Sequence, residues 1–225
     1  MISEKQQSAE AATEYVKDGM IVGLGTGSTA EYAVKKLGER VRNGLSIRGI
    51  PTSDATKKLA DDEGIPLIEF SETMFIDLTI DGADEIDADL NMIKGGGAAL
   101  LREKIVASAS REEIIIVSGT KLVQQLGAFP LPVEVVPFGW QVIFNQLESL
   151  LGNPELRLEQ GQPLITDQGN YIIDCHFRKI EKAKQLEQQL NMIPGVVENG
   201  LFINLCTRMI LSDGDKIIVK NRNSS

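Results

Sequence analysis

Four segments of the sequence combine residue types and spacings that could do chemistry. The first, Gly23–Ala30 (GLGTGSTA), follows a short apolar run and precedes a stretch with helical spacing. Glycines allow a sharp turn that exposes backbone N–H groups, and a helix N-terminus adds partial positive charge. The residues expected to bind a phosphate are Thr26, Gly27, Ser28 and Thr29, although a plain tight turn would look similar. The segment has neither the GK[ST] of a Walker A loop nor the acidic partner of a dinucleotide fingerprint.

The second segment is acidic and directly follows the apolar stretch MFIDLTI. In doubly wound proteins, ligands bind at the carboxyl ends of parallel strands, which is where this segment is expected. Its candidate binding residues are Asp81, Gly82, Ala83 and Asp84. The later acids fit a solvated loop. A Mg²⁺ site is a further option, but nothing in the spacing fixes a coordination set.

The third segment is Lys94 followed by Gly95, Gly96 and Gly97, which run into a stretch of helical spacing. Three glycines before a helix can form a nest of N–H groups that holds an oxyanion. Lys94 is expected to stand beside it as a mobile cation. Glu103 lies one to two turns into the predicted helix. A lone helical glutamate is usually a surface residue, but its place behind an anion-binding nest makes it a candidate base.

The fourth segment, Ser118–Lys121 (SGTK), follows a run of isoleucine and valine typical of a strand buried on both faces. Lys121 could reach an anion at the same sheet edge, or it could be a solvated lysine after a capping turn. The single histidine, His176, is expected to be structural. Cys175 and Cys206 lack metal-ligand spacing and are expected to be buried thiols, with a disulfide left open.

Composition narrows the classes of protein. The chain has 225 residues, 42% of them hydrophobic and 24% charged, with a net charge of −9. This balance excludes a disordered or fibrous chain, and the acidic total argues against a nucleic-acid partner. No apolar run approaches the roughly 18 residues of a membrane span, and the N-terminus lacks the apolar core of a signal peptide. A cytoplasmic protein without a membrane partner is therefore expected.

The order of predicted strands and helices, which must position these segments, changes at about residue 127. Up to about residue 127, strand and helix signals alternate, including a candidate strand at 66–69, which predicts a doubly wound α/β fold with a mostly parallel sheet. Beyond it, the order β-α-β-β-α-β predicts a ferredoxin-like α+β domain, with a helix expected over 179–190. The predicted domains are 1–127 plus 203–225, and 128–202. Phe138 and Trp140 begin a predicted helix and are expected to be core or inter-domain contacts.

Taken together, these segments resemble ribose-5-phosphate isomerases of the A type, and the likeness covers most of the chain. The blocks, in that family's order, are VGLGTGSTA, TSDAT, DGADEID, MIKGGGAALLREKIVA, FPLPVEVVPF, TDQGNYIIDC and PGVVENGLF. The glycine–lysine–glutamate block is very specific, whereas GTGST also occurs in related sugar-phosphate and coenzyme A transferase folds. SGTKLV lacks the acidic residue usual two or three positions before the lysine, and LCTRMILSDGD is looser than the family pattern.

The resemblance implies interconversion of D-ribose 5-phosphate and D-ribulose 5-phosphate in the non-oxidative branch of the pentose phosphate pathway. It implies a Rossmann-like sheet domain with a small α+β domain, no metal or organic cofactor, and a homodimer. Glu103 matches the family's base, and Lys94 with the glycine nest would stabilise an enediolate. Loop 26–29 and Lys121 would hold the phosphate. How ring opening divides between Asp81, Asp84 and Lys94 stays open.

Two other functions fit the same scaffold. A non-catalytic sugar-phosphate sensor would bind ribose 5-phosphate and leave it unchanged, but the chain has no spare helix-turn-helix segment. A coenzyme A transferase or an amino-sugar phosphate deaminase is the second alternative. A deaminase is expected to carry a histidine in its site, and His176 belongs to the other predicted domain.

Overall fold

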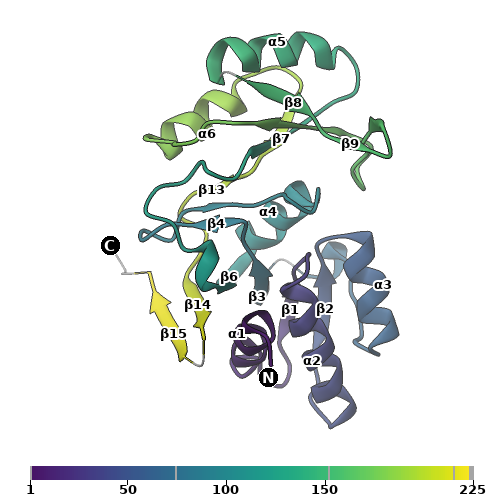
Figure 1. Cartoon of the computed structure of the whole chain (residues 1–225). Coiled ribbons are helices and arrows are strands. Elements are labelled where there is room, and N and C mark those ends of the chain that lie inside the picture. The colour runs from purple at the N-terminus through teal and green to yellow at the C-terminus, as the bar shows by residue number, and fades with distance from the viewer. Residues whose placement is uncertain (1, 74, 152, 215, 223–225) are drawn as a thin grey trace. The chain divides into compact units, whose positions relative to one another are not determined.

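The computed structural model describes residues 2–73, 75–151, 153–214 and 216–222 (Figure 1). The chain forms two compact units, each built from more than one stretch of sequence. The first unit comprises Met1–Ala83, Arg102–Leu122 and Asn204–Ser225, and the second comprises Asp84–Leu101 and Val123–Ile203. The predicted domain boundaries at 127 and 202 stay a prediction. The two compact units differ from the predicted domains in one respect, since residues 84–101 belong to the second unit rather than to the first.

A six-stranded, mostly parallel sheet forms the centre of the first unit. Its order is β15-β14-β6-β3-β1-β2, and only the β14–β15 pair is antiparallel. The strands are β1 (Ile21–Leu24), β2 (Arg48–Pro51), β3 (Ile76–Gly82), β6 (Ser110–Ser118), β14 (Arg208–Asp213) and β15 (Lys216–Asn221). The predicted α/β class with a mostly parallel sheet is confirmed.

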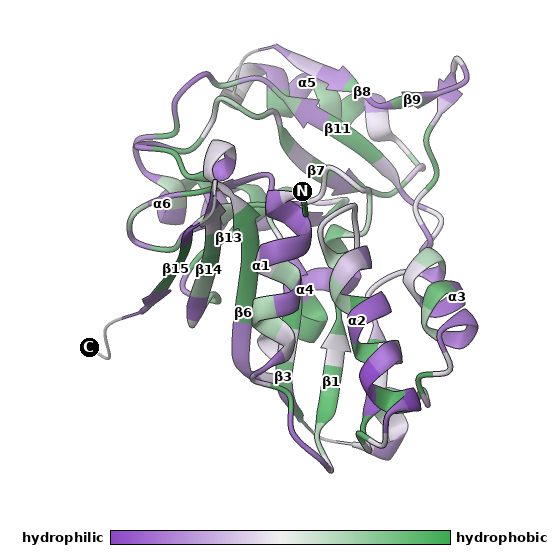
Figure 2. Ribbon diagram, turned by 60° about the horizontal axis from the view of Figure 1, so that its bottom comes forward, coloured by the Kyte–Doolittle hydropathy of each residue, from purple (hydrophilic) through white to green (hydrophobic). Residues whose placement is uncertain are grey.

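Helices cover both faces of this sheet, because successive strand residues point to opposite sides. On one face, Val22 packs in a core that α1 (Glu4–Thr13), α2 (Ala30–Arg42) and α3 (Asp54–Asp62) complete. On the other face, Ile21 packs with Val106 of α4 (Leu100–Ser108). Figure 2 shows apolar strands behind helices α1 and α2, which carry polar residues on their outer sides. In a parallel sheet covered by helices on both faces, the loops that follow the strands lie together at the carboxyl-terminal edge of the sheet.

The second unit contains a four-stranded antiparallel sheet of order β12-β7-β11-β8. In chain order its elements are β7 (Leu131–Val135), α5 (Trp140–Leu151), β8 (Pro154–Leu156), β11 (Tyr171–Cys175), α6 (Ala183–Asn191) and β12 (Val196–Asn199). The predicted β-α-β-β-α-β order is therefore confirmed, with a small hairpin of β9 (Leu158–Glu159) and β10 (Gln162–Pro163) inserted before β11.

A short three-stranded sheet explains why 84–101 belongs to this second unit. β5 (Met92–Ile93) pairs with β4 (Glu85–Ile86) on one side and with β13 (Leu201–Phe202) on the other. Strands of two residues carry no periodicity, so the sequence predicts only an acidic loop there.

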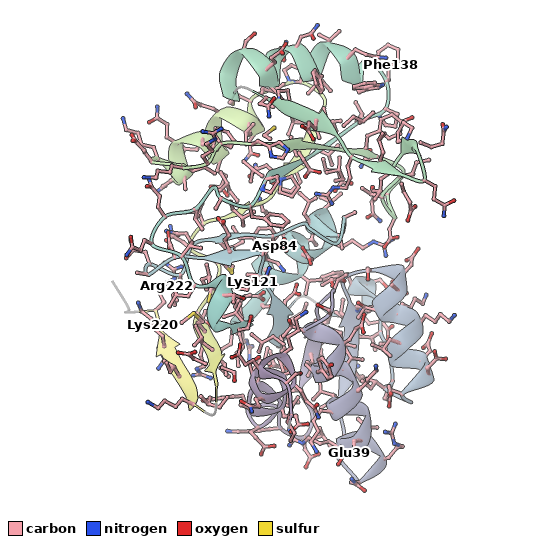
Figure 3. The ribbon with its side chains drawn as sticks, in the orientation of Figure 1. Glu39, Asp84, Lys121, Phe138, Lys220 and Arg222 are labelled. Carbon is pink, nitrogen blue, oxygen red and sulfur yellow. The ribbon has the colours of Figure 1, made fainter. Side chains whose placement is uncertain are left out.

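Three further expectations differ from the structure. The candidate strand at 66–69 is one bridge, Gly49 to Leu67, followed by the 3-10 turn η1 (Phe70–Glu72). Helix α6 begins at Ala183 rather than at residue 179, because the backbone of Ile180 is bonded to Leu126 instead of entering a helix. Phe138 is 93% exposed and is not a core residue (Figure 3). Its position just before α5 leaves its ring on the surface of the second unit.

Candidate functional site

The glycine-rich loop of the first unit runs from the end of β1 to the start of α2. Gly25 continues the strand pairing, because its N–H donates to the carbonyl of Ile80 at 3.0 Å. The N–H of Thr26 donates to the carboxylate of Asp81 at 3.1 Å. The Thr26 hydroxyl lies 2.7, 2.8 and 3.1 Å from the hydroxyls of Thr52, Ser53 and Thr56. The Thr26 side chain therefore attaches the loop to the segment that contains Thr52, Ser53 and Thr56.

The polar face of the loop is made by the next three residues. Gly27 and Ser28 are exposed, and Gly27 has a φ of +103° that favours glycine. Thr29 is the N-cap of α2, and its side chain makes no capping hydrogen bond in the described part of the chain. Donors at the first turn of a 13-residue helix are suited to an anion.

Lys5 contacts this loop from a different element, and the sequence alone did not indicate it. It lies in the first turn of α1, and its Nζ donates to Ser28 Oγ at 2.7 Å. The ammonium group therefore adds positive charge beside the loop that is expected to hold a phosphate. No motif surrounds Lys5 in the sequence, and only the packing of α1 beside α2 brings it there.

Asp81 is fixed at the tip of β3. Its side chain is 1% exposed, and Oδ1 accepts from the N–H groups of Gly82 at 2.7 Å and Thr26 at 3.1 Å. Gly25 makes this approach possible, since a Cβ there would lie 2.3 Å from Asp81 Oδ1. Asp81 is thus a buried carboxylate locked to the glycine loop rather than part of a solvated acidic segment. Gly82 and Ala83 connect it to Asp84 along the chain.

Glu103 and Lys121 complete the predicted residues of the first unit. Glu103 lies in the first turn of α4 and is 4% exposed, so it is not the surface residue that its helical setting alone would suggest. Its neighbour Arg102 makes a surface ion pair instead, with Nη1 2.7 Å from Asp54 Oδ1. Lys121 ends the 3-10 turn η2 (Gly119–Lys121), directly after β6, and is partly buried.

In the second unit, the structure brings Asp84 and the three glycines together. Asp84 Oδ2 accepts from the N–H of Gly96 at 2.8 Å, and a Cβ on Gly96 would lie 2.6 Å from Asp84 Oδ1. Gly95 has a φ of +101°, and its carbonyl accepts from the N–H of Ala98 at 3.0 Å. The glycines therefore form a compact turn, and α4 begins three residues beyond Gly97 rather than directly after it.

Lys94 differs from the mobile cation that the sequence suggests. Its side chain is 2% exposed, and its ammonium group lies 5.5 Å from the centroid of the Phe202 ring. Its N–H donates to the carbonyl of Gly200 at 2.9 Å, and a Cβ on Gly200 would lie 2.4 Å from the Lys94 carbonyl oxygen. Lys94 is therefore a buried, oriented cation, held by the strand pairing of β5 with β13.

The remaining titratable candidates take structural positions. Cys175 and Cys206 are free and buried, as expected. His176 follows β11 in the second unit, with Nε2 3.5 Å from Glu155 Oε2. Among the described residues, no group of three or more histidine, cysteine, aspartate or glutamate side chains could hold a metal ion. Within the same residues, no helix is long and apolar enough to cross a membrane.

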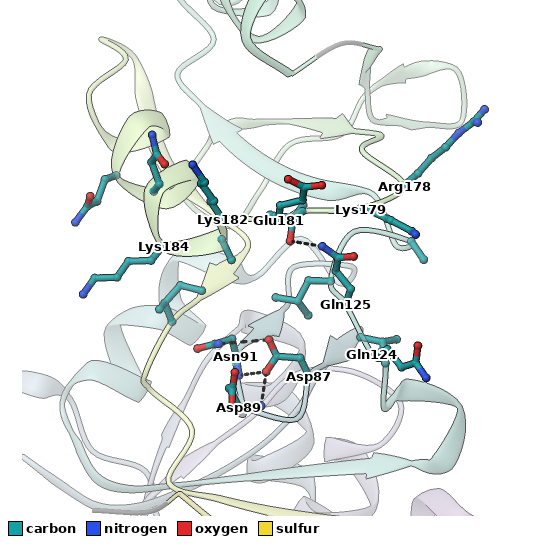
Figure 4. A pocket seen from close by; sticks show the side chains of 18 residues that line it. Asp87, Asp89, Asn91, Gln124, Gln125, Arg178, Lys179, Glu181, Lys182 and Lys184 are labelled. Atoms are coloured by element: carbon teal, nitrogen blue, oxygen red, sulfur yellow. Dashed lines mark hydrogen bonds between the residues drawn. The ribbon is translucent and has the colours of Figure 1, made fainter. Parts of the chain in front are cut away.

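Two cavities formed by described residues contain none of the predicted site residues. One of about 1110 Å³ lies in the second unit, lined by α6 and by the loops around Asp87 and Gln125 (Figure 4). Its basic side chains do not converge, since Arg178 and Lys184 extend in opposite directions. Another of about 390 Å³ lies in the first unit beside Arg102, and its floor is mainly apolar. Neither cavity collects a set of groups that points to a reaction.

Comparison with known proteins adds an independent observation. The model of the family described as ribose 5-phosphate isomerase A (phosphoriboisomerase A) matches residues 48–216. Ribose-5-phosphate isomerase A 1 of Oceanobacillus iheyensis is 49% identical over 217 residues, covering 96% of this chain and 97% of its own. The solved ribose 5-phosphate isomerase of Plasmodium falciparum superposes with a TM-score of 0.96 at 37% identity, over 100% of both chains. A solved D-ribose-5-phosphate isomerase in complex with phospho-erythronic acid gives a TM-score of 0.94 at 40% identity, over 97% of this chain and 98% of its own.

Proposed function

Because the chain belongs to the ribose-5-phosphate isomerase A family, we propose that it interconverts D-ribose 5-phosphate and D-ribulose 5-phosphate with Glu103 as the base. The observation that carries this assignment is the burial of the Glu103 carboxyl group on α4. An aldose–ketose isomerisation needs one carboxylate that serves two adjacent carbons. The chain's only histidine, His176, lies 3.5 Å from Glu155 and is not assigned to the reaction.

The proposed reaction conserves atoms and charge. Glu103 removes the proton from C2 of the open-chain aldose, and the electron pair moves through C1–C2 to place negative charge on O1. The enediolate is protonated on O1 and loses the proton of its C2 hydroxyl, while Glu103 returns a proton to C1. One related isomerase is solved in complex with phospho-erythronic acid, a phosphorylated sugar acid, which is consistent with a sugar-phosphate substrate.

The developing charge needs donors that are already in place. Lys94, with its buried ammonium group, and the N–H groups of the Gly95–Gly97 turn other than that of Gly96, which donates to Asp84, are assigned to the enediolate oxygens. One well-placed donor of this kind is worth about 3–4 kcal/mol in the transition state. Asp81 and Asp84 are assigned to the sugar hydroxyl protons, and with Lys94 they share the opening of the furanose ring.

The phosphate is assigned to the loop at the start of α2. Backbone N–H groups of Gly27, Ser28 and Thr29 would face the phosphate oxygens, with the ammonium groups of Lys5 and Lys121 beside them. The 2.7 Å contact between Lys5 and Ser28 supports this assignment, because it concentrates positive charge at the loop of an otherwise acidic chain.

Proton NMR of ribose 5-phosphate in D₂O tests the function directly. The wild-type protein should form ribulose 5-phosphate and exchange the C2 proton, whereas a non-catalytic sensor would leave the sugar unchanged. Glu103→Gln keeps the shape of the side chain and removes the base, so kcat should fall at least about 10²-fold with little change in KM. The matched control is Glu39→Gln, an exposed helical glutamate that pairs with Lys36 on the surface of α2 (Figure 3). A Glu103→Gln protein with near wild-type kcat would remove Glu103 from the mechanism, and Asp81 would be the next base to test.

The assembly and the cellular place of the enzyme belong to the same proposal. We propose a homodimer, as the resemblance to the isomerase family implies, and a cytoplasmic location, as expected from the sequence. The ring of Phe138, exposed on the second unit, is an apolar group that a two-fold contact could cover. Light scattering at micromolar concentration should give a mass of about 50 kDa, twice the 24.6 kDa of one chain. A value near that of one chain would refute the dimer.

A further inference from the structure

Arg157 divides its guanidinium group between two partners within the second unit. Its Nε and Nη2 donate to the two carboxylate oxygens of Asp174 at 2.8 and 2.5 Å. Its Nη1 donates to the carbonyl oxygens of Gly95 at 2.9 Å and Gly96 at 3.2 Å. The two charged side chains are 15% and 18% exposed, so water competes little for these bonds. Arg157 therefore ties β11, which carries Asp174, to the glycine turn.

These contacts determine how the glycine peptides are oriented. The peptide bonds of this turn are trans, since the described residues contain no cis peptide bond, so the carbonyl and the N–H of each peptide point in opposite directions. The Gly95–Gly96 peptide is held at both ends, by Arg157 on its oxygen and by Asp84 on its N–H. The carbonyl of Gly96 also faces Arg157, which turns the N–H of Gly97 toward the opposite side.

Such an orientation is what an oxyanion site requires. Donor N–H groups can face an anion only if the neighbouring carbonyls, which would repel it, are turned away and held there. Glycine gives the backbone the freedom to form this turn, as the φ of +101° at Gly95 illustrates, and that same freedom would let the turn relax. A planar guanidinium can bind a carboxylate at two points and still reach two carbonyls, which the point charge of a lysine cannot do.

We infer that Arg157, oriented by Asp174, is a positioning residue that holds the glycine turn so that the N–H of Gly97 faces the oxyanion formed during isomerisation. This inference rests on the proposed function and extends it to residues that no sequence motif indicated. Arg157 acts through the backbone of the turn and does not itself contact the reacting atoms.

The experiment compares the full-length wild-type protein with Arg157→Lys, Arg157→Ala and Asp174→Asn. A misplaced donor costs up to about 10²-fold in rate, so both arginine variants should lose between about 10- and 100-fold in kcat, with KM changed less than about threefold. The kcat of Asp174→Asn should lie between that of the arginine variants and that of the wild type. Added guanidinium ion should restore part of the activity of Arg157→Ala and none of that of Glu103→Gln, because only the former lacks a guanidinium group.

A control variant with lowered thermal stability distinguishes a positioning role of Arg157 from a general loss of stability. Leu186→Ala removes a buried side chain of α6 from the hydrophobic core of the same unit. It should lower Tm while kcat stays within about twofold of the wild type. The inference is refuted if Arg157→Ala keeps wild-type kcat, or if it loses no more activity than a control of equal Tm.

Amide hydrogen exchange tests the role of Arg157 separately from the proposed isomerase activity. Exchange at Gly96 and Gly97 should accelerate in Arg157→Ala relative to the wild type and to Leu186→Ala. If the wild-type protein shows no isomerisation, the proposed function fails and the role of Arg157 in that reaction falls with it, whereas the exchange rates still report whether Arg157 holds the turn. Unchanged exchange in Arg157→Ala would refute the clamp, whatever the activity.

Discussion

Replacing Gly25 by alanine tests whether the close approach of the glycine loop to Asp81 holds the site together. The φ of Gly25 lies outside the left-handed region, so alanine would meet no backbone strain there. The new Cβ would instead lie 2.3 Å from Asp81 Oδ1, 2.4 Å from its Cγ and 2.6 Å from its Cα. Rotation of the carboxylate cannot relieve the last overlap, because Cα belongs to strand β3.

The size of the effect follows from these distances. Carbon atoms in contact need about 3.5 Å, so loop and strand must separate by roughly 1 Å. That shift would stretch the 3.1 Å bond from Thr26 N–H to Asp81 beyond hydrogen-bond range. Overpacking costs about 1–3 kcal/mol and a lost bond to a carboxylate about 1.5–3 kcal/mol. The free energy of unfolding should therefore fall by about 3–5 kcal/mol, and kcat/KM by at least about 10²-fold, since Asp81 and the phosphate loop would both move.

The assay pairs urea unfolding with isomerase kinetics, and Gly44 supplies the control. Gly44 follows α2 with a φ of +105°, and a Cβ there would meet nothing within 4 Å. Gly44→Ala should cost about 1–2 kcal/mol of backbone strain and leave kcat/KM unchanged. If Gly25→Ala stays within about 1 kcal/mol of the wild type and keeps its activity, the close approach does not position Asp81 and the reasoning is wrong.

Three further predictions follow from the charged and titratable groups. Lys121→Ala and Lys5→Ala should each raise KM more than they lower kcat in steady-state assays, because phosphate binding is shared by ground and transition states; a collapse of kcat at constant KM would place either lysine in the chemistry. Burial raises the pKa of the Glu134 carboxyl, so its contribution to stability is complete below the unfolded pKa of about 4.5 and is lost as pH rises through the folded pKa. Urea titrations between about pH 4 and pH 8 should therefore show a fall in unfolding free energy that is absent from Glu134→Gln, and parallel curves would contradict this. Burial also raises the pKa of the Cys175 and Cys206 thiols to about 12, so a thiol reagent at neutral pH should label them only after unfolding, and rapid labelling of the folded protein would show that they are accessible.

Much of the fold could be predicted because its long elements carry strong periodic signals. The isoleucine and valine run of β6 and the alternation before residue 127 predict a parallel sheet, and both are confirmed. β14 escaped prediction because its residues follow an irregular stretch, and its partner β6 lies about 90 positions earlier. The two-residue strands β4, β5 and β13 are too short for any pattern, so the second unit begins earlier in the chain than the rhythm of the sequence suggests.

The chemistry-bearing residues divide in the same way. Loop 26–29, the segment 81–84 and the glycine turn 95–97 are each a continuous stretch of sequence, so residue type and spacing within each stretch were enough to indicate it. Lys5 and Arg157 were missed because each meets its partner across a long separation, 23 residues for Lys5 and Ser28 and 62 for Arg157 and Gly95. The burial of Lys94 depends on Phe202, more than 100 residues away, and no local pattern contains that information.

Glycines in this chain do more than permit turns. At Gly25, Gly96 and Gly200, none of which has a left-handed φ, an added Cβ would lie 2.3–2.6 Å from Asp81, Asp84 and Lys94, respectively. Each glycine is thus required by the close approach of a second segment rather than by its own backbone conformation. A sequence motif records the glycine but not the segment that approaches it. For that reason the glycine blocks predict where the chemistry lies. Only the fold shows that the absence of a Cβ at these glycines lets Asp81, Asp84 and Lys94 pack closely against them.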